Sequence, residues 1–199
     1  MAMCKKMATA GAVAAMGLGL GAASASAYAV SGGSYTGAAT GNHSFTIAGA
    51  YTFTCPAVGV RFAGTATGSA TTSFAPGFGV NCSFFGLPAQ STQVGPWSIT
   101  VTSGPDGAGW YGADLHIPTG SSITLEVPLA GCTVAIAGTQ GFANGVGSNV
   151  VRAKNTTPTG VQLEIAIENI AFSATGCPFS SAIGGTFTGT VDIPGITVS

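Results

Sequence analysis

Charged side chains are scarce in this sequence. Lysine and arginine number five and aspartate and glutamate six among 199 residues, so charged residues make up 6% of the chain, where about 25% is usual. An ordinary cytosolic enzyme surface is therefore excluded. Hydrophobic residues reach 46%, which suffices for a packed core and argues against intrinsic disorder. The 32 glycines follow no G-X-Y period, which excludes collagen.

Long, strongly apolar runs are also missing, and the one candidate lies at the N-terminus. Lys5 and Lys6 precede a weakly apolar run at residues 7–23, and Ala25-Ser26-Ala27 supplies the small residues that a signal peptidase requires. The run is too weakly apolar for a spanning helix, which needs roughly 20 strongly apolar residues. We therefore predict a signal peptide at residues 1–27 and a secreted or surface-associated mature chain without a transmembrane anchor.

Clustered cations are absent as well. Removing 27 of the 199 residues leaves 172, with Arg61, Arg152 and Lys154 against six acidic residues and a formal charge of −3. Three scattered cations cannot neutralise a run of phosphates, which supplies most of the affinity for nucleic acid. Binding to anionic lipid headgroups likewise needs clustered lysine and arginine. Nucleic acid is therefore excluded as a partner.

Cleavage would leave four cysteines, none of them in a close C-x-x-C pair. An even number in an exported chain predicts two disulfides, and the lack of a close pair argues against a zinc site. Three connectivities are possible. We favour Cys55–Cys82 with Cys132–Cys177, because sequential pairing closes the shorter loops and would staple each half of the sheet system separately.

Helical periodicity is absent from the mature chain, and short alternating runs rich in β-branched and aromatic residues recur instead. About nine strands are predicted, at residues 44–54, 58–66, 79–85, 97–103, 123–127, 133–137, 161–167, 171–174 and 186–193. Turn clusters of Gly, Pro, Asn and Asp separate them. These features predict a single all-β domain at residues 43–199, an antiparallel β-sandwich or irregular barrel. Residues 28–42 are expected to be a leader or an edge strand, and residues 152–160 a long loop.

A convincing catalytic constellation is lacking. Asp114 and His116 would share one face of a strand, as an orienting carboxylate and a base do, but no G-x-S-x-G motif accompanies them. His43 is expected to be exposed at a strand start. Glu164 and Glu168 would lie about 13 Å apart on a strand, beyond the roughly 5–9.5 Å used by glycosidases. We predict no enzymatic activity, no cofactor and no metal site.

Aromatic residues offer the one candidate ligand surface. Trp97 follows Pro96 and precedes an alternating apolar run, so we expect it in the core. Trp110 and Tyr111 adjoin a glycine-rich turn, and flat rings give contact area to sugars or apolar ligands at little entropic cost. Trp110 and Tyr111 are therefore the candidate ligand or adhesion surface.

The low charge itself predicts association. Soluble monomers use like charges, and lysine on exposed strand edges, to stay apart, whereas the predicted mature chain has one lysine. We expect a structural or adhesive protein of the cell surface, matrix or fibre, whose partners are further copies of itself or other surface components. The alternative is an extracellular binding module for a carbohydrate or an apolar small molecule.

The positions of the four cysteines along the chain resemble those in a known protein family. A strand ends at Cys55, Cys82 precedes Pro96-Trp97, and Cys132 and a late Cys177 follow. Across residues 51–198 this pattern resembles the bacterial family called protein activator of alkane oxidation. The resemblance implies a secreted or surface-associated, non-enzymatic protein linked to the use of, or adhesion to, hydrophobic substrates.

Overall fold

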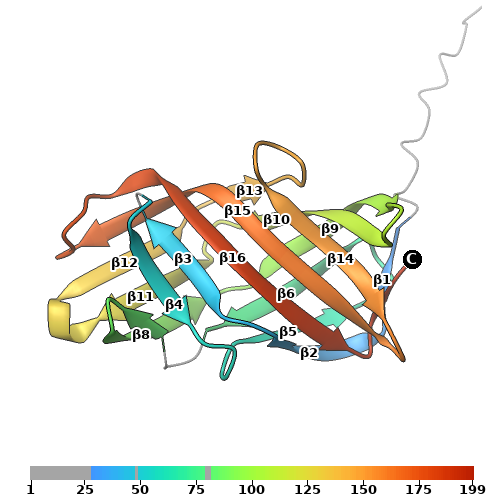
Figure 1. Cartoon of the computed structure of the whole chain (residues 1–199). Helices are drawn as coiled ribbons and strands as arrows, with labels where there is room; N and C mark the ends of the chain where they lie inside the picture. The colour runs from blue at the N-terminus through green and yellow to red at the C-terminus, as the bar shows by residue number, and fades with distance from the viewer. Residues whose placement is uncertain (1–27, 48, 79–81) are drawn as a thin grey trace, which may run out of the picture.

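The two longest strands, β15 (Gly160–Thr175) and β16 (Ala182–Pro194), pair with each other and run diagonally across the molecule (Figure 1). Val161, Leu163, Ile165 and Ile167 of β15 are buried, as their period-two spacing predicts. The computed structural model describes residues 28–47, 49–78 and 82–199, so the predicted signal peptide lies outside the described residues.

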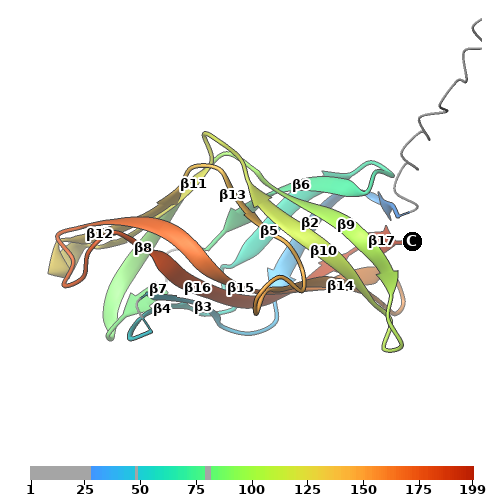
Figure 2. The ribbon, with the colours of Figure 1, turned by 90° about the horizontal axis from the view of Figure 1, so that it is seen from above.

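The sheet closes into two rings of eight strands that share β15 and β16. The first ring adds β3 (His43–Ile47), β4 (Tyr51–Cys55), β7 (Cys82–Phe84), β8 (Leu87–Val94), β11 (Ser122–Val127) and β12 (Cys132–Ala137). The second ring adds β2 (Gly33–Ala39), β5 (Arg61–Ala66), β6 (Thr71–Gly77), β9 (Trp97–Pro105), β10 (Trp110–Ile117) and β14 (Val150–Thr156). All pairings are antiparallel. The rings lie end to end, which gives the described chain its elongated shape (Figures 1 and 2).

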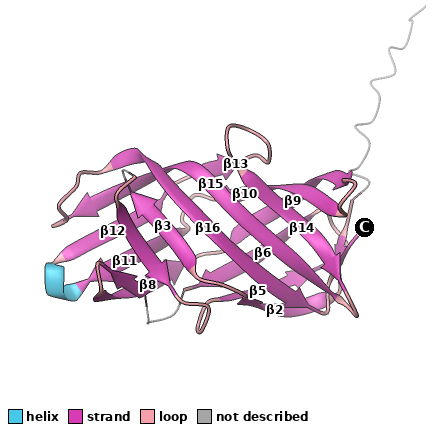
Figure 3. Cartoon of the chain, viewed as in Figure 1, coloured by secondary structure: helices cyan, strands magenta, loops and turns pink. Residues whose placement is uncertain are grey.

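Three short strands and one turn of 3-10 helix complete the described chain. β13 (Gln140–Phe142) pairs with β10, while β1 (Val30–Ser31) pairs with β17 (Thr197–Val198). The 3-10 turn η1 (Pro128–Ala130) is the single helical element among the described residues and lies at the far end of the first ring (Figure 3). No helix in the described ranges has the length and apolar character needed to cross a membrane.

A register shift marks the point at which β15 passes from one ring to the other. Before it, β15 pairs with β14, and after it with β12. The pairing with β16 is irregular between Ile167 and Ile170, and Asn169 adopts φ = 60°. Asparagine is among the few residues that tolerate this left-handed region, and such irregularities bend a strand. Asn169 therefore lets one strand serve two rings.

Side chains fill both rings. The first encloses a cavity of about 20 Å³ lined by residues such as Phe45, Phe53 and Phe187, and the second one of about 30 Å³ lined by residues such as Phe62, Phe74 and Leu163. Each cavity has room for one or two water molecules, since a cavity needs roughly 10–15 Å³ to hold one. The ring interiors are therefore packed cores and not ligand sites.

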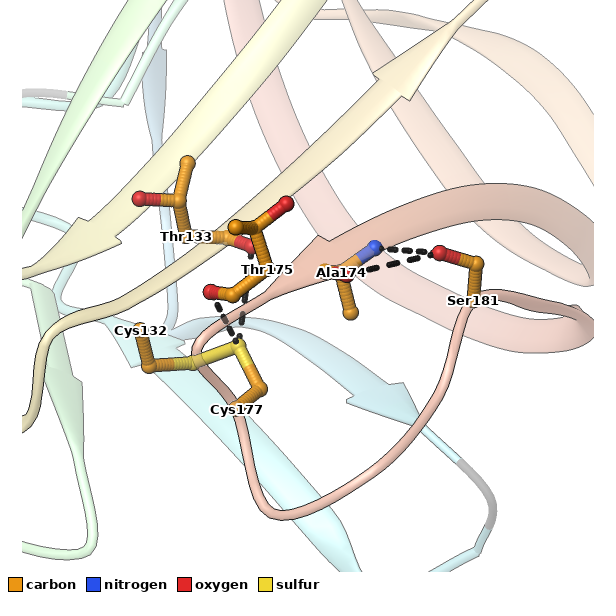
Figure 4. The surroundings of a disulfide bond; sticks show 6 residues. All are labelled: Cys132, Thr133, Ala174, Thr175, Cys177 and Ser181. Carbon is orange, nitrogen blue, oxygen red and sulfur yellow. Dashed lines mark hydrogen bonds between the residues drawn. A yellow bond between two sulfur atoms is a disulfide. The ribbon is translucent and has the colours of Figure 1, made fainter.

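The all-β antiparallel class and the disulfide pairing predicted from the sequence are confirmed. Cys55 bonds to Cys82, and Cys132 to Cys177. Both bonds lie in the first ring, so the expectation that each would hold a separate half is wrong. Figure 4 shows that Cys177 sits in the loop between β15 and β16, which Ser181 also holds through a 2.7 Å hydrogen bond from the Ala174 amide.

Other sequence expectations require correction. The described chain has 17 strands where about nine were predicted. In place of a leader or an edge strand at residues 28–42, β2 lies between β5 and β16. In place of a loop at residues 152–160, β14 extends to Thr156. Both missed segments are rich in small or polar residues. Backbone pairing with neighbouring strands, and not an intrinsic β-propensity, makes them strands.

Candidate functional site

Trp110 and Tyr111 begin β10 but do not form a shared aromatic surface. Successive side chains of a strand point to opposite faces. Tyr111 packs against the core, with its ring centroid 6.4 Å from that of Tyr28. Trp110 is half-buried on the outer side and lines a surface groove of about 230 Å³. Trp97, as expected, is buried.

The groove lies on the outer face of the second ring. One wall is the end of β9 and the turn that follows it, which contribute Ser103 and Asp106. The other wall is the 143–149 loop between β13 and β14, which contributes Asn144 and Asn149. Gly112 lines the groove and is itself buried. A Cβ atom at this position would overlap Ser103 Oγ and lie 2.8 Å from Asn144 Nδ2. Glycine at residue 112 therefore lets these two polar groups converge on the groove.

Two cations flank the indole of Trp110. Lys154 is its register partner on β14, with Nζ 5.7 Å from the ring centroid, and Arg152 Cζ lies 4.4 Å from the same centroid. Arg152 Nε and Nη2 both lie 2.8 Å from Glu164 Oε2. The cation–π contact and the ion pair together hold Arg152 and Trp110 in place.

Asp106 orders the turn at the mouth of the groove. Its Oδ1 accepts hydrogen bonds from the amides of Ala108 (2.8 Å) and Trp110 (2.9 Å). These backbone donors, that of Trp110 first, lower the pKa of Asp106, and Arg152 adds a smaller effect in the same direction. Both of these hydrogen bonds go to Oδ1, and neither uses the other oxygen, Oδ2. Asp106 is therefore a fixed, ionised acceptor at the groove.

The opposite wall is held by side-chain hydrogen bonds to its backbone. Asp114 Oδ1 accepts from the Asn144 amide at 3.1 Å, and Asn144 Oδ1 accepts from the Val151 amide at 3.0 Å. Glu168 Oε1 accepts from the Ser148 amide at 2.9 Å. Asn149 Oδ1 accepts from the Glu168 amide at 2.9 Å. This loop is therefore preorganised, and its role as a groove wall was missed by sequence reasoning.

The residues considered for catalysis have other roles. Asp114 holds the groove loop, and no hydrogen bond joins it to the exposed His116 in the described chain. Glu164 pairs with Arg152 and Glu168 with the loop backbone. Within the described ranges, no group of three or more His, Cys, Asp or Glu side chains is placed to hold a metal ion.

His43 is buried, so its predicted exposure is wrong. The ring is 1% exposed and is surrounded by Phe62, Phe78 and Phe187 at centroid distances of 5.6–6.0 Å. Nε2 donates to the Thr190 carbonyl at 3.2 Å, whereas Nδ1 has no partner among the described residues. Burial lowers the pKa of His43, against the smaller opposing effect of the Thr190 hydrogen bond. The ring is therefore neutral in the folded protein at pH 7.

Acid is expected to destabilise the protein through His43. The folded-state pKa of His43 lies below the ordinary 6.5, so the unfolded state takes up a proton at a higher pH than the folded state does. The free energy of unfolding is therefore at its full value above pH 6.5 and decreases as the pH falls toward the folded-state pKa. The free energy of unfolding should fall by up to about 1.4 kcal/mol per pH unit there, the limit for one proton. Urea titrations between pH 5 and 8 should show this slope in the wild type and in His116→Gln, and a shallower one in His43→Phe. Equal slopes in all three proteins would contradict the assignment.

Another surface feature lies at the end of the first ring that is farthest from the second ring. We define the apolar end as Phe85, Leu87, Leu129 and Ile183, all exposed large hydrophobic residues. Phe85 contacts Tyr51, which also packs on Phe179 at a centroid distance of 4.7 Å. Of the six strands that belong to the first ring alone, only β11 carries a charged residue, Glu126. All three cations of the described chain lie on β5 and β14 of the second ring.

Comparisons of the chain with protein families, curated proteins and solved structures found no match.

Proposed function

We propose that the protein is a secreted, non-enzymatic structural or adhesive component of the bacterial cell surface, matrix or fibre that associates with further copies of itself through the apolar end. The observation that carries this proposal is the clustering of large apolar side chains where charge is nearly absent. Leu129 is 76% exposed and Phe85 67% exposed. Exposed apolar clusters of this kind are typical of protein–protein contact sites.

A second copy of the chain is the occupant that the charge distribution favours. Two copies of this end can meet without like-charge repulsion, because the loops at residues 85–86, 128–131 and 176–181 contain no charged residue. A charged partner would find no opposite charge there to pair with. The fixed loop geometry, with the Cys132–Cys177 bond behind it, also limits the ordering entropy of association.

Strand-edge pairing is the less favoured mode of association. Each of the fourteen ring strands has a strand partner on both sides, and closed sheets lack the long free edges that template β-augmentation. The residues expected to seek an edge partner, 28–42, already supply β2. End-to-end contact therefore accounts better for self-association than completion of an edge.

Substituting the apolar end is expected to weaken association at least tenfold. The experiment is light scattering over a concentration series of residues 28–199 at pH 7 with disulfides intact, comparing the wild type with Phe85→Ser/Leu129→Ser. A tenfold change corresponds to about 1.4 kcal/mol, well within the contribution of two large apolar side chains.

Val58→Ser is the matched control, because Val58 is also 76% exposed but lies in the loop between β4 and β5, away from the apolar end. It should associate like the wild type. A wild-type mass of one chain at every concentration would overturn the proposal. An equal effect of Val58→Ser would show that general surface hydrophobicity, and not the apolar end, drives association.

A further inference from the structure

We infer that the groove beside Trp110 is a binding site for a neutral saccharide. This inference is independent of the proposed self-association, since the groove lies on the second ring and the apolar end on the first. It starts from the convergence of an indole, a carboxylate, two side-chain amides and a hydroxyl on one groove.

The hydrogen-bonding groups of the groove match the hydroxyls of a sugar. Each sugar hydroxyl both donates and accepts. Asp106 Oδ2 is an acceptor that neither the Ala108 nor the Trp110 hydrogen bond uses. The Nδ2 groups of Asn144 and Asn149 are donors whose companion Oδ1 atoms already accept from backbone amides. Ser103 Oγ accepts from the Gly112 amide at 3.1 Å and retains its own proton for donation. The groove lining thus offers both acceptors and donors to a bound sugar.

Acidic side chains outnumber cations around the groove, which favours a neutral ligand over an anionic one. Arg152 is paired with Glu164, which leaves Lys154 as the one remaining cation against Asp106, Asp114 and Glu168. A carboxylated or sulfated sugar would have to approach the ionised Asp106, whose low pKa keeps it charged in mildly acidic surroundings. A neutral ring meets no such repulsion and can use Asp106 as an acceptor.

The size and rigidity of the groove also suit one sugar unit. Its volume of about 230 Å³ is smaller than the roughly 300–1,000 Å³ of sites for drug-sized molecules. The site therefore fits a single ring of a chain whose neighbouring units remain in solvent. Both walls are already held by side-chain hydrogen bonds to the backbone, so little ordering entropy is lost on binding.

The two tryptophans make the test direct. Trp97 is buried and Trp110 lines the groove, so a ligand there alters the emission of Trp110 alone. Residues 28–199 would be titrated with neutral hexaoses of glucose (β1,4 and β1,3 linked), N-acetylglucosamine, xylose, mannose and galactose, and with hexagalacturonate as the anionic comparator. Emission and calorimetric heat would both be recorded. We expect binding of at least one neutral hexaose in preference to hexagalacturonate.

Asp106→Asn is the decisive variant, because asparagine keeps the Oδ1 acceptor of the turn but replaces the other carboxylate oxygen with a donor. It should weaken binding at least tenfold by calorimetry, and Trp110→Phe should weaken binding and abolish the emission change. Asp192→Asn, at an exposed acid on β16 outside the groove, should bind like the wild type. Phe85→Ser/Leu129→Ser should keep saccharide binding, which separates this test from that of self-association. Absence of binding to every neutral hexaose, preference for hexagalacturonate, or unchanged binding in Asp106→Asn would each overturn the inference.

Discussion

Removal of the Cys132–Cys177 bond in Cys132→Ala/Cys177→Ala is expected to lower the free energy of unfolding by about 4 kcal/mol. The bond closes a loop of sequence separation 45, and cross-linking stabilises mainly by reducing the entropy of the unfolded chain, more so for longer loops. The same relation gives about 3.5 kcal/mol for Cys55–Cys82, whose sequence separation is 27. Removing both is expected to cost about 7.5 kcal/mol, which is half or more of a typical stability of about 5–15 kcal/mol.

The removal of Cys132–Cys177 should also disturb the apolar end, because Cys177 and Phe179 share one loop. Phe179 packs on Tyr51, and Tyr51 on Phe85. Urea unfolding at pH 7 of both double-alanine variants would measure the stability losses, and light scattering of the folded fraction would measure association. We expect Cys132→Ala/Cys177→Ala to associate more weakly than Cys55→Ala/Cys82→Ala. Losses below about 1 kcal/mol would show that the unfolded chain is not constrained as the loop-entropy argument requires.

The parts of the fold that could be predicted from sequence are those that depend on local pattern. Alternation in β15 revealed its buried residues, and an even cysteine number with sequential spacing led to the observed pairing. β2 could not be predicted in this way, because its sequence, GSYTGAA, has few large apolar residues and becomes a strand through pairing with β5 and β16. Ring closure depends on such long-range pairings throughout, so it has no local signal.

The candidate site shows the same division. Trp110 stood out as an aromatic residue beside a turn, and Asp106 lies in the Pro-Asp-Gly sequence of that turn. Asn144 and Asn149 could not be placed near them, since they lie more than thirty positions along the chain and reach the groove through the pairing of β13 and β14 with β10. His43 did carry a usable signal: it shares the period of Phe45 and Ile47 in β3 and is buried with them. The expectation that histidine is exposed at a strand start outweighed that pattern.

Phe53→Ala is expected to cost about 3–5 kcal/mol of stability, the range for truncating a buried phenylalanine. Phe53 is 1% exposed, stacks on Phe84 at a centroid distance of 4.4 Å and lines the cavity of the first ring. The vacated ring volume would join that existing cavity, which makes collapse of the surroundings harder and puts the cost toward the upper end. Urea unfolding at pH 7 measures the loss.

Phe85→Ala is the matched control, since it removes the same atoms from a 67% exposed residue of the same ring and should change stability by no more than about 0.5 kcal/mol. The enlarged cavity in Phe53→Ala is lined mainly by apolar side chains, and such cavities take up small apolar molecules. Saturating benzene should therefore raise the Tm of Phe53→Ala and leave that of the wild type unchanged, because a ligand that binds only the folded state stabilises it. Similar losses in the two variants would mean that the first ring is not the packed core on which the fixed geometry of the apolar end depends.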